Sequence, residues 1–165
     1  MSFTLDAVDR EIIRLLLQDG RQSNAELARQ IEGANERLVR YRIGRLLKEG
    51  VIQINAIVNP AALGYGLIAD VWVEVEAGQA VKVAKKLAEL DRARFVSYST
   101  GGMKNVTVQI VARNLEEMYA YVSEVIENVP GVERTQIMLI PSILKDIDDW
   151  LPPADAARPG SDGRP

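Results

Sequence analysis

The sequence predicts an α+β protein with a helical N-terminal part and a C-terminal part of alternating strands and helices. Over residues 1–50, apolar side chains recur at helical spacing in three runs, each followed by a glycine. Later, short β-branched runs and two amphipathic runs follow in the order strand, helix, strand, strand, helix, strand. The change of pattern at Gly50 predicts two domains, which a chain of 165 residues can accommodate.

Three helices are expected in the first part. The first spans about residues 6–18 and begins at an aspartate that can cap it. The second begins at Ser23, whose hydroxyl has the capping-box spacing to the carboxylate of Glu26. The third uses Asn35 as its N-cap and ends near Lys48, just before a glycine.

The third helix concentrates positive charge. Residues 35–48 contain five Lys or Arg and one Glu, a net charge of +4, although the whole chain has a net charge of −3. At about 100° per residue, one face is apolar and includes Leu47, while Arg37, Tyr41 and Arg45 lie on the opposite face. Such a charged face is often merely solvated. A preceding capped helix and a short glycine-containing turn favour instead a winged helix-turn-helix that binds double-stranded DNA.

Arginine near the start of a recognition helix is suited to guanine edges, and the other cations to phosphates or bases. Replacing Arg37 or Arg45 by alanine should weaken operator binding by about 1–3 kcal/mol if each contacts a base. The predicted DNA-binding residues are Ser23, Asn35, Arg37, Arg40, Tyr41, Arg42, Arg45 and Lys48.

The later pattern predicts a ferredoxin-like βαββαβ domain, in which a four-stranded antiparallel sheet carries helices on one face. The expected strands are 67–75, 94–99, 106–112 and 132–140, and the expected helices are 79–90 and 115–128. The inward residues expected in the second of these helices are Leu115, Met118, Val122 and Val125.

The domain boundaries follow from these patterns. We expect a DNA-binding domain over 1–50, a linking segment over 51–64, a ligand-sensing and oligomerisation domain over 65–147 and a tail over 148–165. The linking segment opens with Val51–Val58, which reads as a strand. The tail is acidic and then rich in Pro and Gly, which predicts disorder from about its fifth residue onward.

Both faces of the first strand of the sheet are partly apolar. Val71 and Val73 alternate with Trp72 and two acidic residues, so one face needs a cover besides the helices. Sheet-to-sheet homodimerisation is the favoured interpretation. Cover by the DNA-binding domain or by the tail remains the alternative.

The composition excludes several classes of protein. The chain contains no Cys and no His, which excludes disulfides and thiolate chemistry and removes the commonest general base and transition-metal ligand. An enzyme is therefore not expected, and neither is a metal or cofactor. No apolar run is long enough to span a bilayer and the N-terminus is not a signal peptide, so a cytoplasmic protein with no membrane partner is expected.

The order and spacing of several short motifs resemble the Lrp/AsnC family of leucine-responsive and asparagine-type transcriptional regulators. The segment just before the third helix departs from the family pattern, with Ala34-Asn35-Glu36 where Leu-Ser-Pro is common, so base contacts are expected to differ. The matching segments are 5–12 (LDAVDREI), 19–21 (DGR), 25–28 (AELA), 49–52 (EGVI), 59–60 (NP), 63–64 (LG), 98–102 (YSTGG) and 129–132 (VPGV).

This resemblance implies a sequence-specific regulator that assembles as a dimer, commonly up to an octamer, with an effector between dimers. The family's acidic loop residue is replaced by Lys104, which would repel an α-ammonium group and attract a carboxylate. The effector, if there is one, is then an amino acid held in an unusual way or another carboxylate. The implied effector-binding residues are Ser99, Thr100, Gly101, Gly102, Met103 and Lys104.

Two other functions remain open. An architectural protein that compacts DNA with little sequence choice would contact mainly phosphates and show a steep salt dependence. Tetrapyrrole decarboxylases are similar to this family in fold and length, but they rely on an active-site His that this chain lacks.

Overall fold

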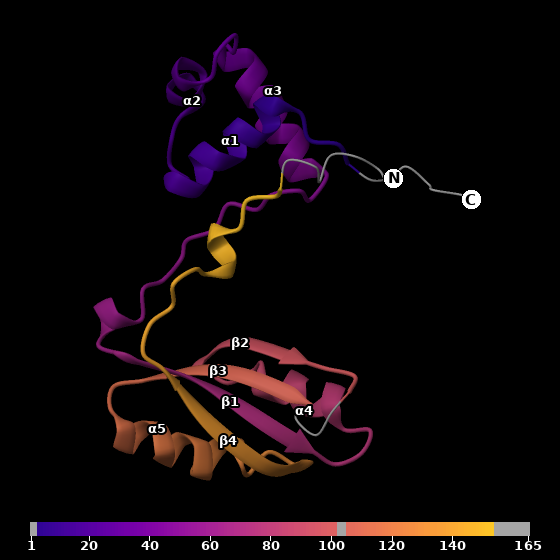
Figure 1. Cartoon of the computed structure of the whole chain (residues 1–165), viewed down its shortest axis with the longest axis vertical. Helices are drawn as coiled ribbons and strands as arrows, with labels where there is room; N and C mark the ends of the chain where they lie inside the picture. The colour runs from indigo at the N-terminus through magenta and orange to yellow at the C-terminus, as the bar shows by residue number, and fades with distance from the viewer. Residues whose placement is uncertain (1–2, 102–104, 154–165) are drawn as a thin grey trace, which may run out of the picture. The chain divides into compact units, whose positions relative to one another are not determined.

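The computed structural model describes residues 3–101 and 105–153, which form two compact units (Figure 1). Unit 1 consists of the described residues of Met1–Ala56 and Leu144–Pro165. Unit 2 consists of those of Ile57–Ile143. Unit 1 extends past Gly50 to Ala56, and the last part of the chain returns to it at Leu144.

Unit 1 contains the three expected helices. They are α1 (Ala7–Gln18), α2 (Asn24–Gln30) and α3 (Glu36–Lys48). Their apolar faces meet in a small core, in which burial of large aliphatic side chains supplies the main stabilisation. The fully or nearly fully buried residues of this core include Ile12, Leu15, Leu27, Val39 and Leu46.

Polar side chains cap all three helices. The Asp6 carboxylate accepts a hydrogen bond from the amide of Asp9 at 2.9 Å, and the reciprocal bond completes a capping box. Ser23 and Glu26 form a second capping box at α2, and Asn35 caps α3. Each cap satisfies backbone amides that have no partner within the helix, so the three starts are defined by local sequence.

Three expectations about unit 1 and its linking segment are wrong. Val51–Val58 is extended but forms no strand, and the side chains of Ile54 and Ile57 are 50% and 70% exposed. A strand requires a hydrogen-bonded neighbour, and the described residues of unit 1 include no other strand. Leu47 is 43% exposed because it lies about 100° around α3 from the fully buried Leu46. The side chain of Arg45 is also not on the exposed face of α3, because it turns towards Asp9 of α1.

Unit 2 is a four-stranded antiparallel sheet with helices on one face, as predicted (Figure 1). The strand order is β2-β3-β1-β4. The strands are β1 (Leu67–Val75), β2 (Ala93–Tyr98), β3 (Val106–Ala112) and β4 (Val132–Ile140). The helices are α4 (Ala80–Leu87) and α5 (Leu115–Tyr121), and α5 continues as the π-helical turn η2 (Val122–Ile126).

The core of unit 2 lies between the sheet and these helices. Alternate residues of β1 and β3 are buried, and Val71 lies opposite Val108 in the register of the two strands. Leu87 of α4 and Met118 of α5 cover them and are fully buried. The alternation leaves the other face of the sheet with partly exposed side chains.

The second helix of unit 2 differs from the sequence expectation. Leu115 is 48% exposed, Val125 is half-buried, and Ile126 is fully buried in its place. The Glu127 amide donates to the Val122 carbonyl, five residues back, so the π turn contains one residue more than an α turn. The inward face therefore shifts by one position towards the C-terminus.

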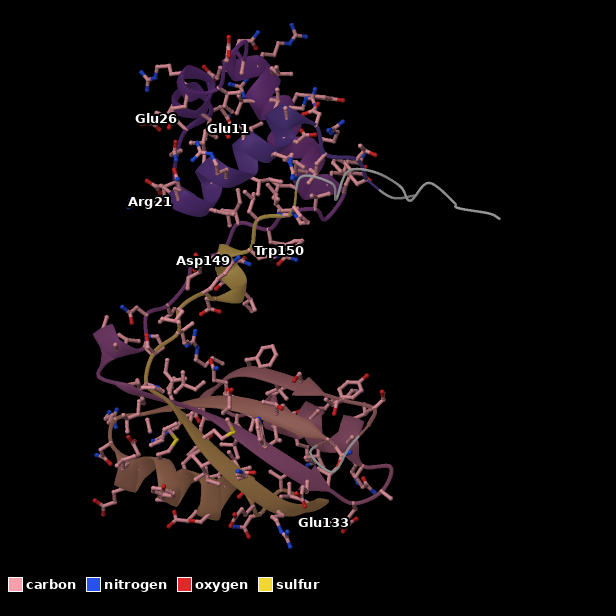
Figure 2. The ribbon with its side chains drawn as sticks, viewed as in Figure 1. Glu11, Arg21, Glu26, Glu133, Asp149 and Trp150 are labelled. Carbon is pink, nitrogen blue, oxygen red and sulfur yellow. The ribbon has the colours of Figure 1, made fainter. Side chains whose placement is uncertain are left out.

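Two short 3-10 turns lie outside the main elements: η1 (Ala61–Leu63) in the linking segment and η3 (Ile147–Asp149) near the C-terminus. A guanidinium nitrogen of Arg10 donates to the carbonyl of Pro152 at 3.0 Å, which joins the C-terminal segment to α1. Trp150 lies between η3 and Pro152 in the C-terminal segment, and its side chain is 59% exposed (Figure 2). The sequence predicts disorder from about residue 152 onward; residues 152 and 153 belong to the described part of the chain, and residues 154–165 lie outside it. Among the described residues, no helix is long and apolar enough to cross a membrane.

Candidate nucleic-acid interface and ligand pocket

The outer face of α3 presents Arg37, Tyr41 and Lys48 to solvent. All three side chains are exposed, and the tyrosine is 65% exposed. Within residues 3–101 and 105–153, neither Arg37 nor Lys48 has an ion-pair partner. Gly44 lies on the same face, and a Cβ there would meet no atom within 4 Å. The face is therefore open, cationic and without bulk at its middle, which suits close approach to a polyanion.

Arg40 lies beside this face and pairs with Glu36 one turn earlier. Both side chains are more than half exposed. Exposed pairs of this kind contribute only about 0–1 kcal/mol. The guanidinium of Arg40 is therefore readily available to a phosphate.

Arg42 and Arg45 instead turn towards α1. Their guanidinium groups donate to the carboxylate of Asp9, which is fully buried, with the shortest contact at 2.5 Å from Arg45. Helical periodicity predicts Arg45 on the exposed face, but its long side chain reaches around the helix to this carboxylate. Only 20% of the Arg42 side chain and 33% of the Arg45 side chain are exposed.

Two further groups complete this cluster. Asp6 accepts from Arg42 at 2.5 Å, and the guanidinium of Arg45 lies 4.7 Å from the ring centroid of Phe3. Burial alone would raise the pKa of Asp6, but hydrogen bonds from the Asp9 amide and from Arg42 outweigh it and lower this pKa. The hydrogen bond to Asp6 in turn raises the pKa of Arg42. The sequence contained one signal of this cluster, an aspartate three residues before Ile12 on the apolar face of a helix.

Ser23 and Asn35 are occupied by local structure. The Ser23 hydroxyl accepts from the amide of Glu26 and donates to its carboxylate, and Asn35 accepts from the amide of Leu38 at 2.9 Å. Both residues therefore fix the starts of α2 and α3. Their role in DNA binding stays a prediction.

The loop between β2 and β3 contains the predicted effector-binding residues. The Ser99 amide donates to the carbonyl of Asn105 at 2.8 Å, and its hydroxyl donates to the carbonyl of Gly101 at 3.3 Å, so these bonds order the described start of the loop. Gly102, Met103 and Lys104 lie outside the described residues. The prediction for the six residues is therefore not tested by the geometry.

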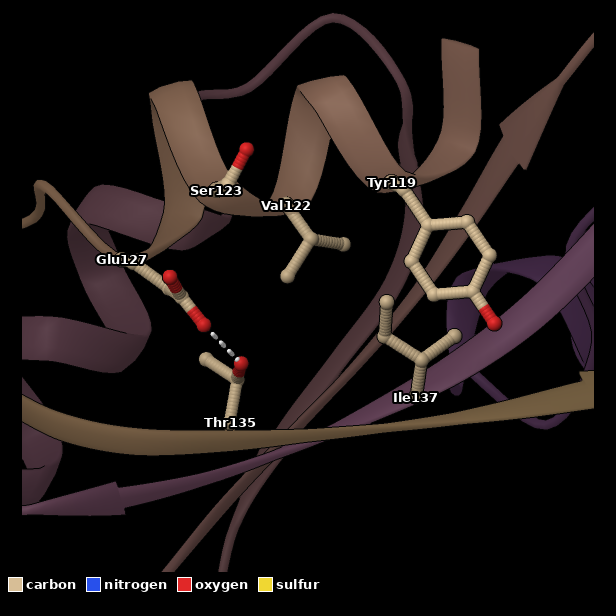
Figure 3. Close-up of a pocket in the computed structure, with 6 residues that line it drawn as sticks. All are labelled: Tyr119, Val122, Ser123, Glu127, Thr135 and Ile137. Atoms are coloured by element: carbon tan, nitrogen blue, oxygen red, sulfur yellow. Dashed lines mark hydrogen bonds between the residues drawn. The ribbon is translucent and has the colours of Figure 1, made fainter. Parts of the chain in front are cut away.

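A pocket of about 320 Å³ opens elsewhere in unit 2, between η2 and β4 (Figure 3). Its size is at the lower end of the range for small-molecule sites. Figure 3 shows the Thr135 hydroxyl donating to the Glu127 carboxylate at one end, with the Tyr119 ring beside Ile137 at the other. The lining residues are Tyr119, Val122, Ser123, Glu127, Thr135 and Ile137.

Sequence reasoning missed this pocket. Ser99, Thr100 and Gly101 are not among its lining residues. The signal that the sequence did contain is Thr135, a polar residue at a position of β4 paired with the fully buried Val73. A small space with the Glu127 carboxylate and the Thr135 hydroxyl at one end and the Tyr119 ring and Ile137 at the other suits a small amphipathic ligand.

Comparison with known proteins agrees with both halves of this structure. A family model for a winged helix-turn-helix DNA-binding domain matches residues 5–53, and one for the Lrp/AsnC ligand-binding domain matches residues 68–149. Among curated proteins, the HTH-type transcriptional regulator FL11 of Pyrococcus abyssi is 38% identical over 141 residues, which cover 85% of this chain and 91% of the relative. FL11 of Pyrococcus horikoshii is 36% identical over the same shares of both chains.

Solved structures show the same fold. Escherichia coli AsnC superposes with a TM-score of 0.78 at 22% identity, covering 88% of this chain and 99% of that one. A transcriptional regulatory protein of Pyrococcus furiosus, described as a member of the AsnC family, gives a TM-score of 0.73 at 28% identity and covers 87% and 94%. Both curated relatives are named HTH-type transcriptional regulators. The chain belongs to the Lrp/AsnC family of DNA-binding transcriptional regulators that carry a ligand-binding domain.

Proposed function

We propose that this regulator reads a specific double-stranded DNA sequence through the outer face of α3, as a homodimer or a larger assembly, under the control of a small effector. The observation that carries the proposal is the open face of α3, where Arg37, Tyr41 and Lys48 are exposed. α3 follows the capped helix α2 after a short turn, which is the order of a helix-turn-helix.

The positions of the cations along α3 suggest different roles. Arg37 lies in the first turn, where recognition helices reach base edges, and its guanidinium can bind guanine in bidentate fashion. Lys48 is the last residue of the helix and is suited to a phosphate. Arg37 is thus expected to supply sequence discrimination and Lys48 mainly affinity.

Selected DNA sites, bound by the full chain over a range of salt concentrations, test these roles. Arg37→Ala should weaken specific binding by about 1–3 kcal/mol and relax the preference at one base position. Lys48→Ala should weaken specific and non-specific binding alike and reduce the salt slope by about one. Lys82→Ala, an exposed lysine of α4 in unit 2, is the control and should leave both unchanged.

Wild-type affinity in both α3 variants would contradict this placement of the interface. If the protein binds all sequences equally with a steep salt dependence, it is architectural instead. Discrimination between sequences by the wild type is therefore the first measurement.

Self-association is proposed from the sheet face that carries no helix. Register and alternation place Trp72, Met138 and Phe95 on this face, and Phe95 and Met138 are 44% and 37% exposed. Large apolar side chains on a sheet face usually mark an interface. A second copy of the same face would supply a two-fold symmetric partner.

The effector is proposed to occupy the pocket beside β4. The Glu127 carboxylate favours an ammonium or other cationic group, and Tyr119 and Ile137 favour a short apolar chain. The loop that contains Lys104 follows β2, at the opposite edge of the sheet from β4, so Lys104 is not assigned to this pocket. An amino acid held mainly through its ammonium group and side chain satisfies the preferences of the pocket.

Thermal unfolding with each amino acid and with short carboxylates tests the pocket. A ligand at 100 times its Kd should stabilise the protein by about 2.7 kcal/mol. Glu127→Gln should abolish this saturable shift, and the neighbouring Glu124→Gln, which does not line the pocket, should retain it. A shift that persists in Glu127→Gln would place the ligand elsewhere.

A further inference from the structure

The five cations of α3 have different partners. Arg37 and Lys48 are exposed without an ion-pair partner among the described residues, and Arg40 has only the exposed carboxylate of Glu36. Arg42 and Arg45 share the carboxylate of Asp9, which has no exposed surface. A carboxylate in that position depends on these guanidinium groups, because an unpaired buried charge is strongly unfavourable.

The contacts fix both arginines from several sides. One nitrogen of Arg42 lies 3.2 Å and 3.3 Å from the two carboxylate oxygens of Asp9 and 2.5 Å from that of Asp6. Arg45 donates to Asp9 at 2.5 Å while its guanidinium lies over the ring of Phe3. Two carboxylates thus balance two guanidinium groups between α1 and α3.

We infer that Asp9 is the positioning residue of the recognition helix, and that Arg42 and Arg45 brace α3 against α1 rather than contact DNA. The inference rests on the proposed function and deepens it, because it divides the cations of the helix into two groups. The DNA-facing charge is then carried by Arg37, Arg40 and Lys48. A DNA phosphate could recruit Arg45 only by leaving Asp9 short of a buried partner.

If Arg45 braces α3 and Lys48 contacts DNA, substitutions at the two positions should have opposite effects on hydrogen–deuterium exchange and on the salt dependence of DNA binding. Arg45→Gln should increase hydrogen–deuterium exchange in the α3 amides of the full chain and leave the salt slope of DNA binding unchanged. Lys48→Gln, the matched control, should reduce the slope by about one and leave exchange in α3 unchanged. Arg45→Lys keeps the charge but not the planar fork, so it should not restore protection.

The role of Asp9 is tested by the ratio of specific to non-specific DNA affinity and by the recovery of this ratio in a double variant. Asp9→Asn should lower the ratio of specific to non-specific affinity by about tenfold, at temperatures where the helices remain folded, because α3 loses its orientation. The double variant Asp9→Asn/Arg45→Gln should recover most of this ratio, since an amide pair replaces the broken ion pair while Arg42 keeps Asp6. A purely stabilising role would change the unfolding temperature but not this ratio.

A reduced salt slope in Arg45→Gln, with unchanged exchange in α3, would overturn the inference by placing Arg45 on DNA. A ratio that is unaffected by Asp9→Asn would overturn it as well. Failure of the wild type to bind DNA would instead contradict the proposed function, and the exchange measurements would still test the brace.

Discussion

At the scale of single residues, burial rather than charge decides what a cation of α3 does. Arg45 and Lys48 are three positions apart, yet one faces a fully buried carboxylate and the other faces solvent. A carboxylate without water is a stronger partner for a guanidinium than the exposed Glu36 is for Arg40. The same residue type therefore serves structure at one position and remains available for binding at another.

One residue-scale prediction concerns Glu36, the only acid within α3. Glu36→Gln should increase DNA affinity several-fold at low salt, because it removes a like charge from the DNA-facing side and releases Arg40. The change in stability should stay within about 1 kcal/mol, since the pair is exposed and the favourable interaction with the helix dipole is small. Titration of labelled DNA with this variant and with Glu116→Gln, on α5, measures the effect. Equal affinities would show that Arg40 does not contact DNA.

At the scale of elements, carboxylates at helix starts define unit 1. Asp6 caps α1, and the Glu26 carboxylate accepts from the amide and hydroxyl of Ser23 at the start of α2. The hydrogen bond from the Ser23 amide holds the pKa of Glu26 below its ordinary value of 4.5. The pKa of Asp6 is likewise below its ordinary value of 3.8, because the bonds from Asp9 and Arg42 outweigh the opposing effect of burial.

These shifts predict acid sensitivity of α1 and α2. A folded-state pKa below the unfolded value means that the contribution to stability is complete above the ordinary values of 3.8 and 4.5. It is lost as the pH falls through the lower folded-state values. Helical circular dichroism of the full chain between pH 6 and about pH 2 should show this loss, and Ser23→Ala, which removes about 1 kcal/mol of capping, should unfold at higher pH. Acid unfolding at the same pH in this variant would exclude the cap at Ser23 as a contributor.

At the scale of the whole molecule, one face of the sheet is covered by helices and the other is not. The uncovered face includes Phe95 and Met138, whose side chains are large and partly exposed. Met138→Glu should dissociate the dimer proposed for this face, with an increase in the dissociation constant of at least about 10-fold, because burying an unpaired carboxylate is costly. Sedimentation velocity measures the change, and Glu124→Lys on η2 is the control. A dimer that survives Met138→Glu would place the interface elsewhere.

The fold was largely predictable because its signals are local. The strands β1, β3 and β4 have the predicted bounds, since alternation and turn residues lie within the segments themselves. The prediction of a strand over Val51–Val58 is wrong because strand formation depends on a hydrogen-bonded neighbour that the segment does not contain. The π turn at Val122–Ile126 was not predicted, because one extra residue per turn leaves no clear trace in an amphipathic pattern.

The candidate site was predictable only in part. The face with Arg37 and Tyr41 follows from helical periodicity, which requires no knowledge of other segments. The pairing of Arg45 with Asp9 joins residues 36 positions apart, and nothing near Arg45 in the sequence announces it. The pocket beside β4 likewise depends on how two elements pack, which periodicity does not describe.

The return of the C-terminal segment to unit 1 makes unit 2 an insertion within another folded unit. The hydrogen bond from Arg10 to the Pro152 carbonyl joins residues near opposite ends of the chain. Unit 1 is therefore complete only after the ribosome has synthesised all of unit 2, and the chain crosses between the units twice, near residues 56 and 143. A protease cut near residue 143 leaves α1–α3 and unit 2 on one covalent chain. A cut near residue 56 instead leaves these helices attached to unit 2 only through the non-covalent contacts of the C-terminal segment, such as the bond from Arg10 to Pro152.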